Sequence, residues 1–85
     1  MNFIDTYFSM EKRFSIGYEE QSGKYYISIP VSNSLSSYEE YYEISKIEHD
    51  RMDIKELSLI AEKCRRREND HKIILKPGTE RGVPS

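Results

Sequence analysis

The 85-residue sequence is poor in the residues that staple small domains or hold metals in them. Its single cysteine, Cys64, excludes an internal disulfide, whereas small secreted domains usually carry several cysteines. A closed zinc site needs four Cys or His ligands grouped in pairs, and the two histidines, His49 and His71, stand apart. We therefore expect no structural metal and a reducing compartment.

Long hydrophobic runs and a basic leader are missing as well. No stretch approaches the ~20 apolar residues that cross a bilayer. The start, MNFIDTYFSMEK, lacks the basic and the continuous apolar regions of a signal peptide. No glycine-rich phosphate loop of the Walker or dinucleotide type occurs. These absences predict a cytoplasmic protein with no membrane span and no cofactor.

Neither sign of charge dominates the chain. There are 13 basic and 15 acidic side chains, and 36% of the residues are hydrophobic, which is typical of a globular domain rather than a disordered one. This balance gives no general attraction to nucleic acid. At this length folding buries only somewhat more than ~60% of the surface of the chain, so we expect a thin core and no catalytic cavity.

Alternating apolar residues predict a β-hairpin. Residues 13–18 and 25–31 both alternate, and Gly23 between them can adopt the positive φ of a tight reversal. Pro30 has no N–H group to donate, so we expect the second strand to lose its partner on one side near residue 30.

A third strand is predicted in the second half of the stretch SSYEEYYEIS, residues 36–45. Alternation would send one set of side chains to one face, namely Tyr38, Glu40, Tyr42 and Ile44. It would send Glu39, Tyr41 and Glu43 to the other face. We expect Tyr42 and Ile44 to lie in the core and the second set to face water.

Two N-capping patterns follow this strand. Ser45 with Glu48 fits a capping box and predicts a short helix from residue 46. Asp53 with Glu56 repeats the pattern and predicts a longer helix from residue 54 to about residue 68. Its buried stripe would consist of Leu57, Ile60, Ala61 and Cys64. On that stripe we expect the thiol to be packed and inert rather than a nucleophile.

The end of the chain predicts a final strand over 71–76, a type II turn at 77–78 and a tail that orders only if docked. The order β-β-β-α-α-β predicts one α+β domain over 1–85, a small antiparallel sheet with helices packed on one face. Its parts are an N-terminal segment 1–12, a core 13–76 and a C-terminal tail 77–85. The N-terminal segment has helical spacing and would cover a sheet edge through Phe3, Ile4, Tyr7 and Phe8.

The tyrosine-rich acidic stretch is the first candidate site. Tyrosines are enriched at protein interfaces, and carboxylates beside them complement a basic partner. The predicted partner-binding residues are Tyr38, Glu39, Glu40, Tyr41 and Glu43. The same pattern also fits a solvated sheet face whose glutamates keep an edge soluble. An exposed strand or the N-terminal aromatic residues would in addition allow a homodimer.

A basic cluster supplies the alternative, a nucleic-acid or anion site. Its residues are Arg65, Arg66, Arg67, Lys76 and Arg81, and Gly78 and Gly82 would allow close backbone approach. Three consecutive helical residues fan through about 200°, however, so they form no flat patch. Basic residues at this place also complement the helix dipole. We therefore treat nucleic-acid binding as the weaker hypothesis.

Several stretches carry a resemblance: FSIGY (14–18), YISIPVSN (26–33), YEEYYEI (38–44) and ILKPGTERGVP (74–84). They resemble a family of short bacterial proteins of unassigned function, which implies no active site to transfer. In size and acidic aromatic surface the chain is also similar to immunity proteins of contact-dependent growth inhibition and related toxin systems. That similarity implies a non-catalytic protein that neutralises one cognate toxin, often a nuclease, whose phosphate-holding surface must be basic.

Overall fold

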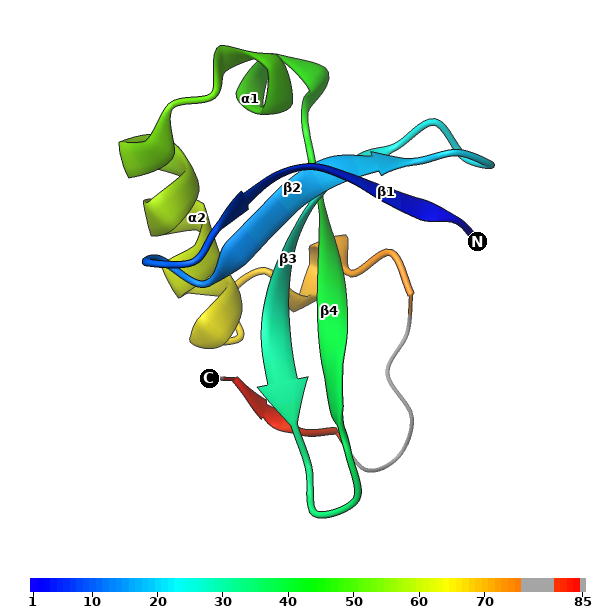
Figure 1. The fold of residues 1–85 in the computed structure, drawn as a ribbon, viewed down its shortest axis with the longest axis vertical. Coiled ribbons are helices and arrows are strands. Elements are labelled where there is room, and N and C mark those ends of the chain that lie inside the picture. The colour runs from blue at the N-terminus through cyan, green and yellow to red at the C-terminus, as the bar shows by residue number, and fades with distance from the viewer. Residues whose placement is uncertain (76–80, 85) are drawn as a thin grey trace.

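The computed structural model describes residues 1–75 and 81–84, and its backbone forms an antiparallel sheet with two helices (Figure 1). Four strands lie in the order β1-β2-β3-β4, and a short fifth strand pairs with β3. The strands are β1 (Phe3–Ser9), β2 (Phe14–Glu19), β3 (Tyr25–Ser32), β4 (Ser37–Ile44) and β5 (Val83–Pro84). The helices are α1 (Lys46–Arg51), α2 (Ile54–Arg65) and a 3-10 turn, η1 (Asp70–Lys72). The predicted α+β class is confirmed.

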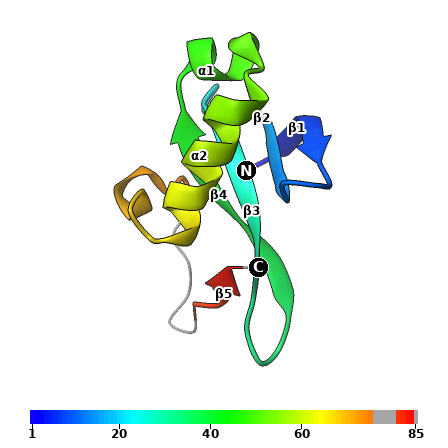
Figure 2. The ribbon, with the colours of Figure 1, turned by 90° about the vertical axis from the view of Figure 1, so that its left-hand side faces the viewer.

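The core lies between α2 and one face of the sheet, as Figure 2 shows with α2 in front of β3 and β4. Of the predicted stripe, Leu57, Ala61 and Cys64 are fully buried, and Ile60 is partly buried against the core. They pack with buried sheet residues that include Ile16 and Ile27. Burying one such aliphatic side chain stabilises the fold by about 1.5–3 kcal/mol, so these few contacts hold the helix on the sheet.

The helix ends follow the capping patterns in part. The box formed by Ser45 and Glu48 is present, and the Asp53 side chain accepts from the backbone of α2. The prediction that α2 continues to about residue 68 is wrong, because the helix ends at Arg65. Arg67 takes a left-handed φ of 63°, and its N–H bonds the carbonyl of Cys64 at 3.0 Å. This is the C-terminal stop that glycine usually provides.

The N-terminal segment is strand β1 and not the helix that its spacing predicts. A β-bulge between Asp5 and Tyr7 explains the error. The extra residue puts Ile4 and Tyr7, three apart, on the same side of the strand, opposite Tyr18 and Ile16 of β2. A strand with a bulge can therefore imitate the spacing of a helix.

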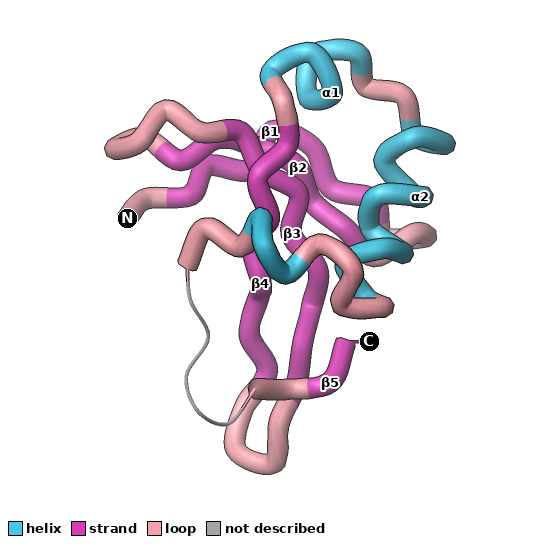
Figure 3. Tube along the Cα trace, turned by 180° about the vertical axis from the view of Figure 1, so that it is seen from behind, coloured by secondary structure: helices cyan, strands magenta, loops and turns pink. Residues whose placement is uncertain are grey.

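The C-terminal region differs most from its prediction. Instead of a strand over 71–76, η1 is followed by a single bridge between Ile73 and Tyr42 of β4. Figure 3 shows η1 lying across β4. Beyond it, β5 pairs with the end of β3, so this part of the tail is docked. The predicted turn at 77–78 lies outside the described residues.

The sheet curls, and its face away from α2 is concave. Pairing of β2 with β3 stops at Ser28, and β5 takes over at Val31, which confirms that Pro30 marks a loss of pairing. Phe3 of β1 stacks on Tyr41 of β4 at a centroid distance of 3.7 Å, although two strands separate them in the sheet. Only a strongly curled sheet brings its outer strands this close.

Candidate functional site

Strand β4 divides the acidic tyrosine stretch between two faces, as its alternation predicts. Tyr42 lies opposite Ile27 on the side of the core, and only 1% of its surface is exposed. Glu40, its neighbour on that side, is 4% exposed. The assignment of Glu40 to a partner-binding surface therefore does not fit the structure. Glu39 and Glu43 point to the concave face.

Glu40 is the centre of a buried ionic cluster. Its carboxylate accepts hydrogen bonds from Arg81 Nε at 2.7 Å, from Tyr42 OH at 2.8 Å and from Arg67. Arg81 also binds Asp70 through two hydrogen bonds of 2.6 and 2.9 Å. The cluster thus ties β4 to the turn after α2, to η1 and to the segment before β5.

The charges in this cluster satisfy one another. Burial by itself would raise the pKa of the Glu40 carboxyl group. Hydrogen bonds from Arg81, Tyr42 and Arg67 outweigh burial, so the pKa lies below its ordinary value. Hydrogen bonds to Asp70 and Glu40 in turn raise the pKa of Arg81. A carboxylate matched in this way holds the chain together and offers no charge to a partner.

The docked tail depends on the same cluster. The N–H of Gly82 donates to Tyr38 OH at 2.8 Å, and Arg67 Nη2 donates to the Gly82 carbonyl at 2.6 Å. A Cβ at this position would lie 2.4 Å from the carbonyl oxygen of Ser32, so glycine permits the close approach to β3. Tyr38, predicted to meet a partner, is therefore engaged within the molecule.

The remaining arginines of the predicted basic cluster also face carboxylates. Arg65 pairs with Glu62 at 2.8 Å, and its Nη2 donates to the backbone carbonyl of Lys12 at 3.0 Å. Arg66 pairs with Glu68 at 2.6 Å. Arg65 thus connects α2 to the β1–β2 turn, and Arg66 forms an ion pair just beyond the C-terminal end of α2.

The two candidate sites therefore meet and neutralise each other. Arg67 and Arg81 of the basic set bind Glu40 of the acidic set. Lys76, the last member of the basic set, lies outside the described residues. The described arginines do not form the open cationic surface that phosphate binding requires.

Three aromatic rings fill one half of the concave face. Phe3 and Tyr41 stack, and Tyr26 meets both rings edge-on at 5.4 and 5.0 Å. The Tyr26 hydroxyl donates to Asp5. A Cβ at Gly17 would lie 2.6 Å from that hydroxyl oxygen, so glycine leaves room for the ring. Tyr41, assigned by sequence to the partner surface, is partly covered by this packing.

Glu39 and Glu43 are the members of the predicted acidic set that stay outward. Glu43 makes a 3.9 Å contact with Lys24, and both side chains are about half exposed. No salt bridge joins Glu39 to a cation among the described residues. Its outer side meets solvent, yet partial burial raises the pKa of Glu39, and the negative charge of Asp5 raises it further.

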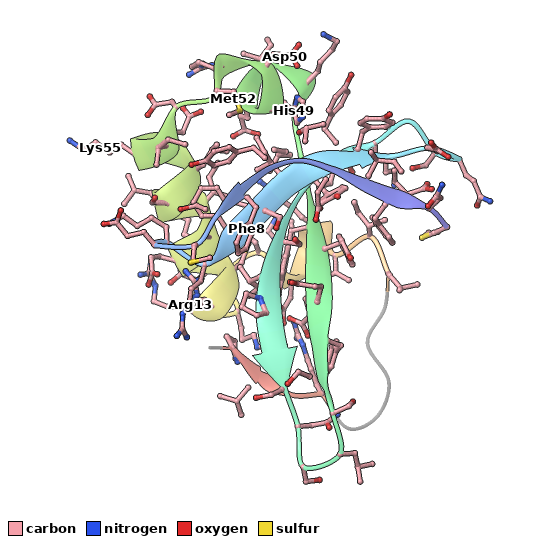
Figure 4. The ribbon with its side chains drawn as sticks, viewed as in Figure 1. Phe8, Arg13, His49, Asp50, Met52 and Lys55 are labelled. Carbon is pink, nitrogen blue, oxygen red and sulfur yellow. The ribbon has the colours of Figure 1, made fainter. Side chains whose placement is uncertain are left out.

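Two exposed apolar side chains lie beside Glu39, and the sequence pattern predicted a position for only one of them, Phe8, at a sheet edge. Phe8 is 57% exposed and Met10 is 80% exposed, and both line a hollow that Glu39 also borders. Figure 4 labels Phe8 at this end of the β1–β2 hairpin. Reading residues 3–9 as a bulged strand would have placed Phe8 on the concave face.

A hydrogen-bonded chain at α1 has the order of a nucleophile, a base and a carboxylate. His49 Nε2 lies 2.7 Å from Thr6 Oγ1, and His49 Nδ1 lies 2.8 Å from Asp50 Oδ1 (Figure 4). Thr6 also bonds the carbonyl of Ile16 at 3.2 Å, and Asp50 also pairs with Lys46. These contacts fasten α1 to β1 and β2, so we assign them a structural role.

Other reactive groups are buried or isolated. Cys64 is fully buried, and burial raises the pKa of its thiol to about 11. A thiol of this kind stays protonated at neutral pH and is a poor nucleophile. Within residues 1–75 and 81–84, no three His, Cys, Asp or Glu side chains are grouped to hold a metal ion.

Comparisons with known proteins give no relative. No protein-family model, no curated protein and no solved structure matches the chain. The resemblance to short bacterial proteins and the similarity to immunity proteins therefore stay predictions. In the described part of the chain, no helix is long and apolar enough to cross a membrane.

Proposed function

We propose that the protein is a non-catalytic binding module whose concave sheet face takes a cationic segment of another protein. The observation that carries this proposal is the uneven use of charge. The arginines of the predicted basic cluster pair with carboxylates, whereas Glu39 on the concave face forms no salt bridge with the described residues, although Arg13 lines the same hollow. Exposed Phe8 and Met10 lie beside it.

A cationic partner with some apolar surface fits this face best. Carboxylates steer an oppositely charged partner, and desolvated aromatic and methionine side chains supply contact energy. The specific form of the proposal is a bacterial immunity protein. Its partner would then be a nuclease-type toxin, whose phosphate-binding surface must be basic, and the concave face would occupy that surface.

Capture from an extract of the organism that encodes the chain tests the proposal. Glu39→Lys with Glu43→Lys reverses charge on the concave face. Glu62→Lys with Glu68→Lys is the matched control, since it changes the net charge equally near the other side of the sheet. We expect the natural chain and the control to retain one basic protein and the concave-face variant to lose it.

Two results would contradict the proposal. In one, the concave-face variant retains the same protein as the natural chain. In the other, light scattering finds a dimer that the concave-face variant dissociates, because a second copy of the chain would then occupy the face.

A further inference from the structure

The short strand β5 covers part of an edge of β3 that β2 leaves open. The pairing of β2 with β3 ends at Ser28, and β4 occupies the other edge of β3 over its whole length. On the open edge β5 pairs with Val31 and Ser32 only (Figure 1). Among the described residues, Ile29 and Pro30 have no partner on this edge. The tail of the chain thus occupies, in part, a place where a strand can add to the sheet.

The residue just before this strand pairing, Arg81, is held by a fixed set of acceptors. Its guanidinium group donates to the Glu40 carboxylate at 2.7 and 3.1 Å and to the Tyr42 hydroxyl oxygen at 3.0 Å. It also donates to Asp70 at 2.6 and 2.9 Å. Glu40 and Tyr42 are buried, so their positions are set by the body of the protein. This arrangement suits the planar fork of an arginine and not the point charge of a lysine.

The next residue of the tail, Gly82, is recognised through its backbone. Its N–H donates to the Tyr38 hydroxyl oxygen at 2.8 Å, and its carbonyl accepts from Arg67 at 2.6 Å. A Cβ at this position would lie 2.4 Å from the carbonyl oxygen of Ser32, so a larger residue cannot approach β3 as closely. The body therefore selects an arginine followed by a glycine in an extended segment.

These contacts do not require that the segment belongs to the same chain. Val83 of β5 is 72% exposed, so its side chain adds little apolar burial to the docking of the tail. The polar contacts that remain are ones that a second Arg-Gly segment reproduces. A segment longer than β5 would also continue along β3 toward Ile29 and gain backbone pairing that β5 does not supply.

We propose that this site binds an extended Arg-Gly segment of another protein, which adds to β3 as a strand and displaces residues 81–84 of the chain itself. The arginine of that segment donates to Glu40 and Asp70, and its glycine lies against Ser32. With the tail in place, Glu40 is matched and offers no charge to a partner, so the site opens only on displacement. The tail acts as a tethered competitor that sets the affinity for the partner.

This site is separate from the concave face. Glu40 lies on the core side of β4, and its neighbour Glu39 lies on the concave side. The inference therefore goes beyond the proposed function and does not depend on it. Failure of the Arg-Gly site would leave the concave-face proposal in place, and the reverse also holds.

A peptide titration of the full-length Arg81→Ala variant tests the inference, because this variant frees the acceptors and leaves them intact. The probe is N-acetyl-Arg-Gly-Val-Pro-amide, followed by the amide NMR signals of the ¹⁵N-labelled chain. The matched control peptide carries citrulline, which keeps the shape of the head without its charge. We expect saturable shifts at Ser32, Tyr38, Tyr42 and Asp70, and at least about tenfold weaker binding of the citrulline peptide.

The natural chain supplies the second comparison. Its own tail competes for the site, so it should bind the arginine peptide at least about tenfold more weakly than Arg81→Ala does. If Arg81→Ala alters amide signals throughout the chain, Gly82→Ala takes its place, since the added Cβ keeps the tail from β3. If both variants lose the fold, the natural chain with millimolar peptide decides alone. Shifts at the same residues then support the site, and their absence overturns it.

Three other results would overturn the inference. The first is equal binding of the arginine and citrulline peptides to Arg81→Ala. The second is equal binding of the arginine peptide to Arg81→Ala and to the natural chain, because the tail would then not compete. The third is a dimer of the natural chain, found by light scattering, that Arg81→Ala dissociates. Tails exchanged between two copies would then fill the site in place of another protein.

Discussion

A single carboxylate, Glu40, shows how one residue changes the meaning of a sequence pattern. It lies within the run YEEYYE next to Glu39, yet one neighbour meets solvent and the other is 4% exposed. Alternation along β4 causes the difference, since successive side chains point to opposite faces. The acidic character of the stretch therefore overstates the charge that the surface offers.

Removing the Glu40 carboxylate should destabilise the protein markedly. Glu40→Ala leaves Arg67 and Arg81 without their shared partner, and we expect the free energy of unfolding to fall by about 2–4 kcal/mol. Chemical denaturation measures this change. Glu43→Ala is the control, because that side chain is half exposed and should matter by less than about 0.5 kcal/mol. Equal effects of the two substitutions would refute the role given to the cluster.

Gly17 occupies a position in β2 where a larger side chain would clash. A Cβ there would lie 2.0 Å from the carbonyl oxygen of Ile4 and close to the Tyr26 hydroxyl. Gly17→Ala should therefore push β1 away from β2 and lower the free energy of unfolding by about 1–3 kcal/mol. Thermal unfolding followed by circular dichroism checks this expectation. An unchanged melting temperature would show that β1 does not pack as described.

At the scale of elements, the Glu19 carboxylate joins the β2–β3 turn to the N-terminal residues through hydrogen bonds that acid should weaken. Glu19 accepts backbone hydrogen bonds from Asn2, Gln21 and Ser22 at 2.8–2.9 Å. These bonds lower the pKa of Glu19 from 4.5 to about 2. A lowered pKa in the folded state contributes stability above the unfolded pKa and loses it as pH falls through the folded one.

An acid dependence of stability follows from these hydrogen bonds. The free energy of unfolding should decrease as pH falls from about 4.5 to about 2, and part of that slope belongs to Glu19. Denaturant unfolding at a series of pH values measures it. Glu19→Gln should show a smaller slope over the same range, with the other lowered carboxyl groups, such as Asp70, accounting for the rest. If the free energy of unfolding depended on pH equally in the natural chain and in Glu19→Gln, the role given to the Glu19 hydrogen bonds would be refuted.

Elements with a strong local signal were predictable, and elements defined by distant partners were not. The β2–β3 hairpin and both helix starts follow from alternation and capping, which nearby residues set. Strand β1 was mistaken because its bulge is a property of its pairing with β2. The sequence does not predict whether the tail docks, because docking depends on contacts with Tyr38, Arg67 and Glu40 from other parts of the chain.

The sequence predicts which face of the sheet carries the outward glutamates, but it does not predict the hollow on that face. Alternation placed Glu39 and Glu43 together on one side of β4, and that placement holds. The hollow beside Glu39 is lined in part by Ser15 and Ser28, which meet only when β2 and β3 pair in register. Two isolated serines form no pattern that predicts a hollow. Their contribution to its lining becomes visible only once the pairing of β2 with β3 is known.

Across the whole molecule, as far as the structure describes it, charged side chains fall into two groups, those paired within the chain and those exposed without an ion pair. The helical side and the docked tail use arginine–carboxylate pairs to hold distant segments together. On the concave face, Glu39 and Arg13 line a largely apolar hollow that also includes Ser15 and Ser28, and Glu39 forms no salt bridge with the described residues. We propose that this face is the one that contacts a partner protein.

Chemical-shift mapping of the ¹⁵N-labelled chain with its purified basic partner tests this division most directly. The proposed function predicts that binding shifts amide signals on the concave face, led by Ser15, Ser28, Glu39 and Glu43, and leaves those of α2 in place. Shifts centred on Arg65, Arg66 and the end of α2, with the concave face unchanged, would contradict it.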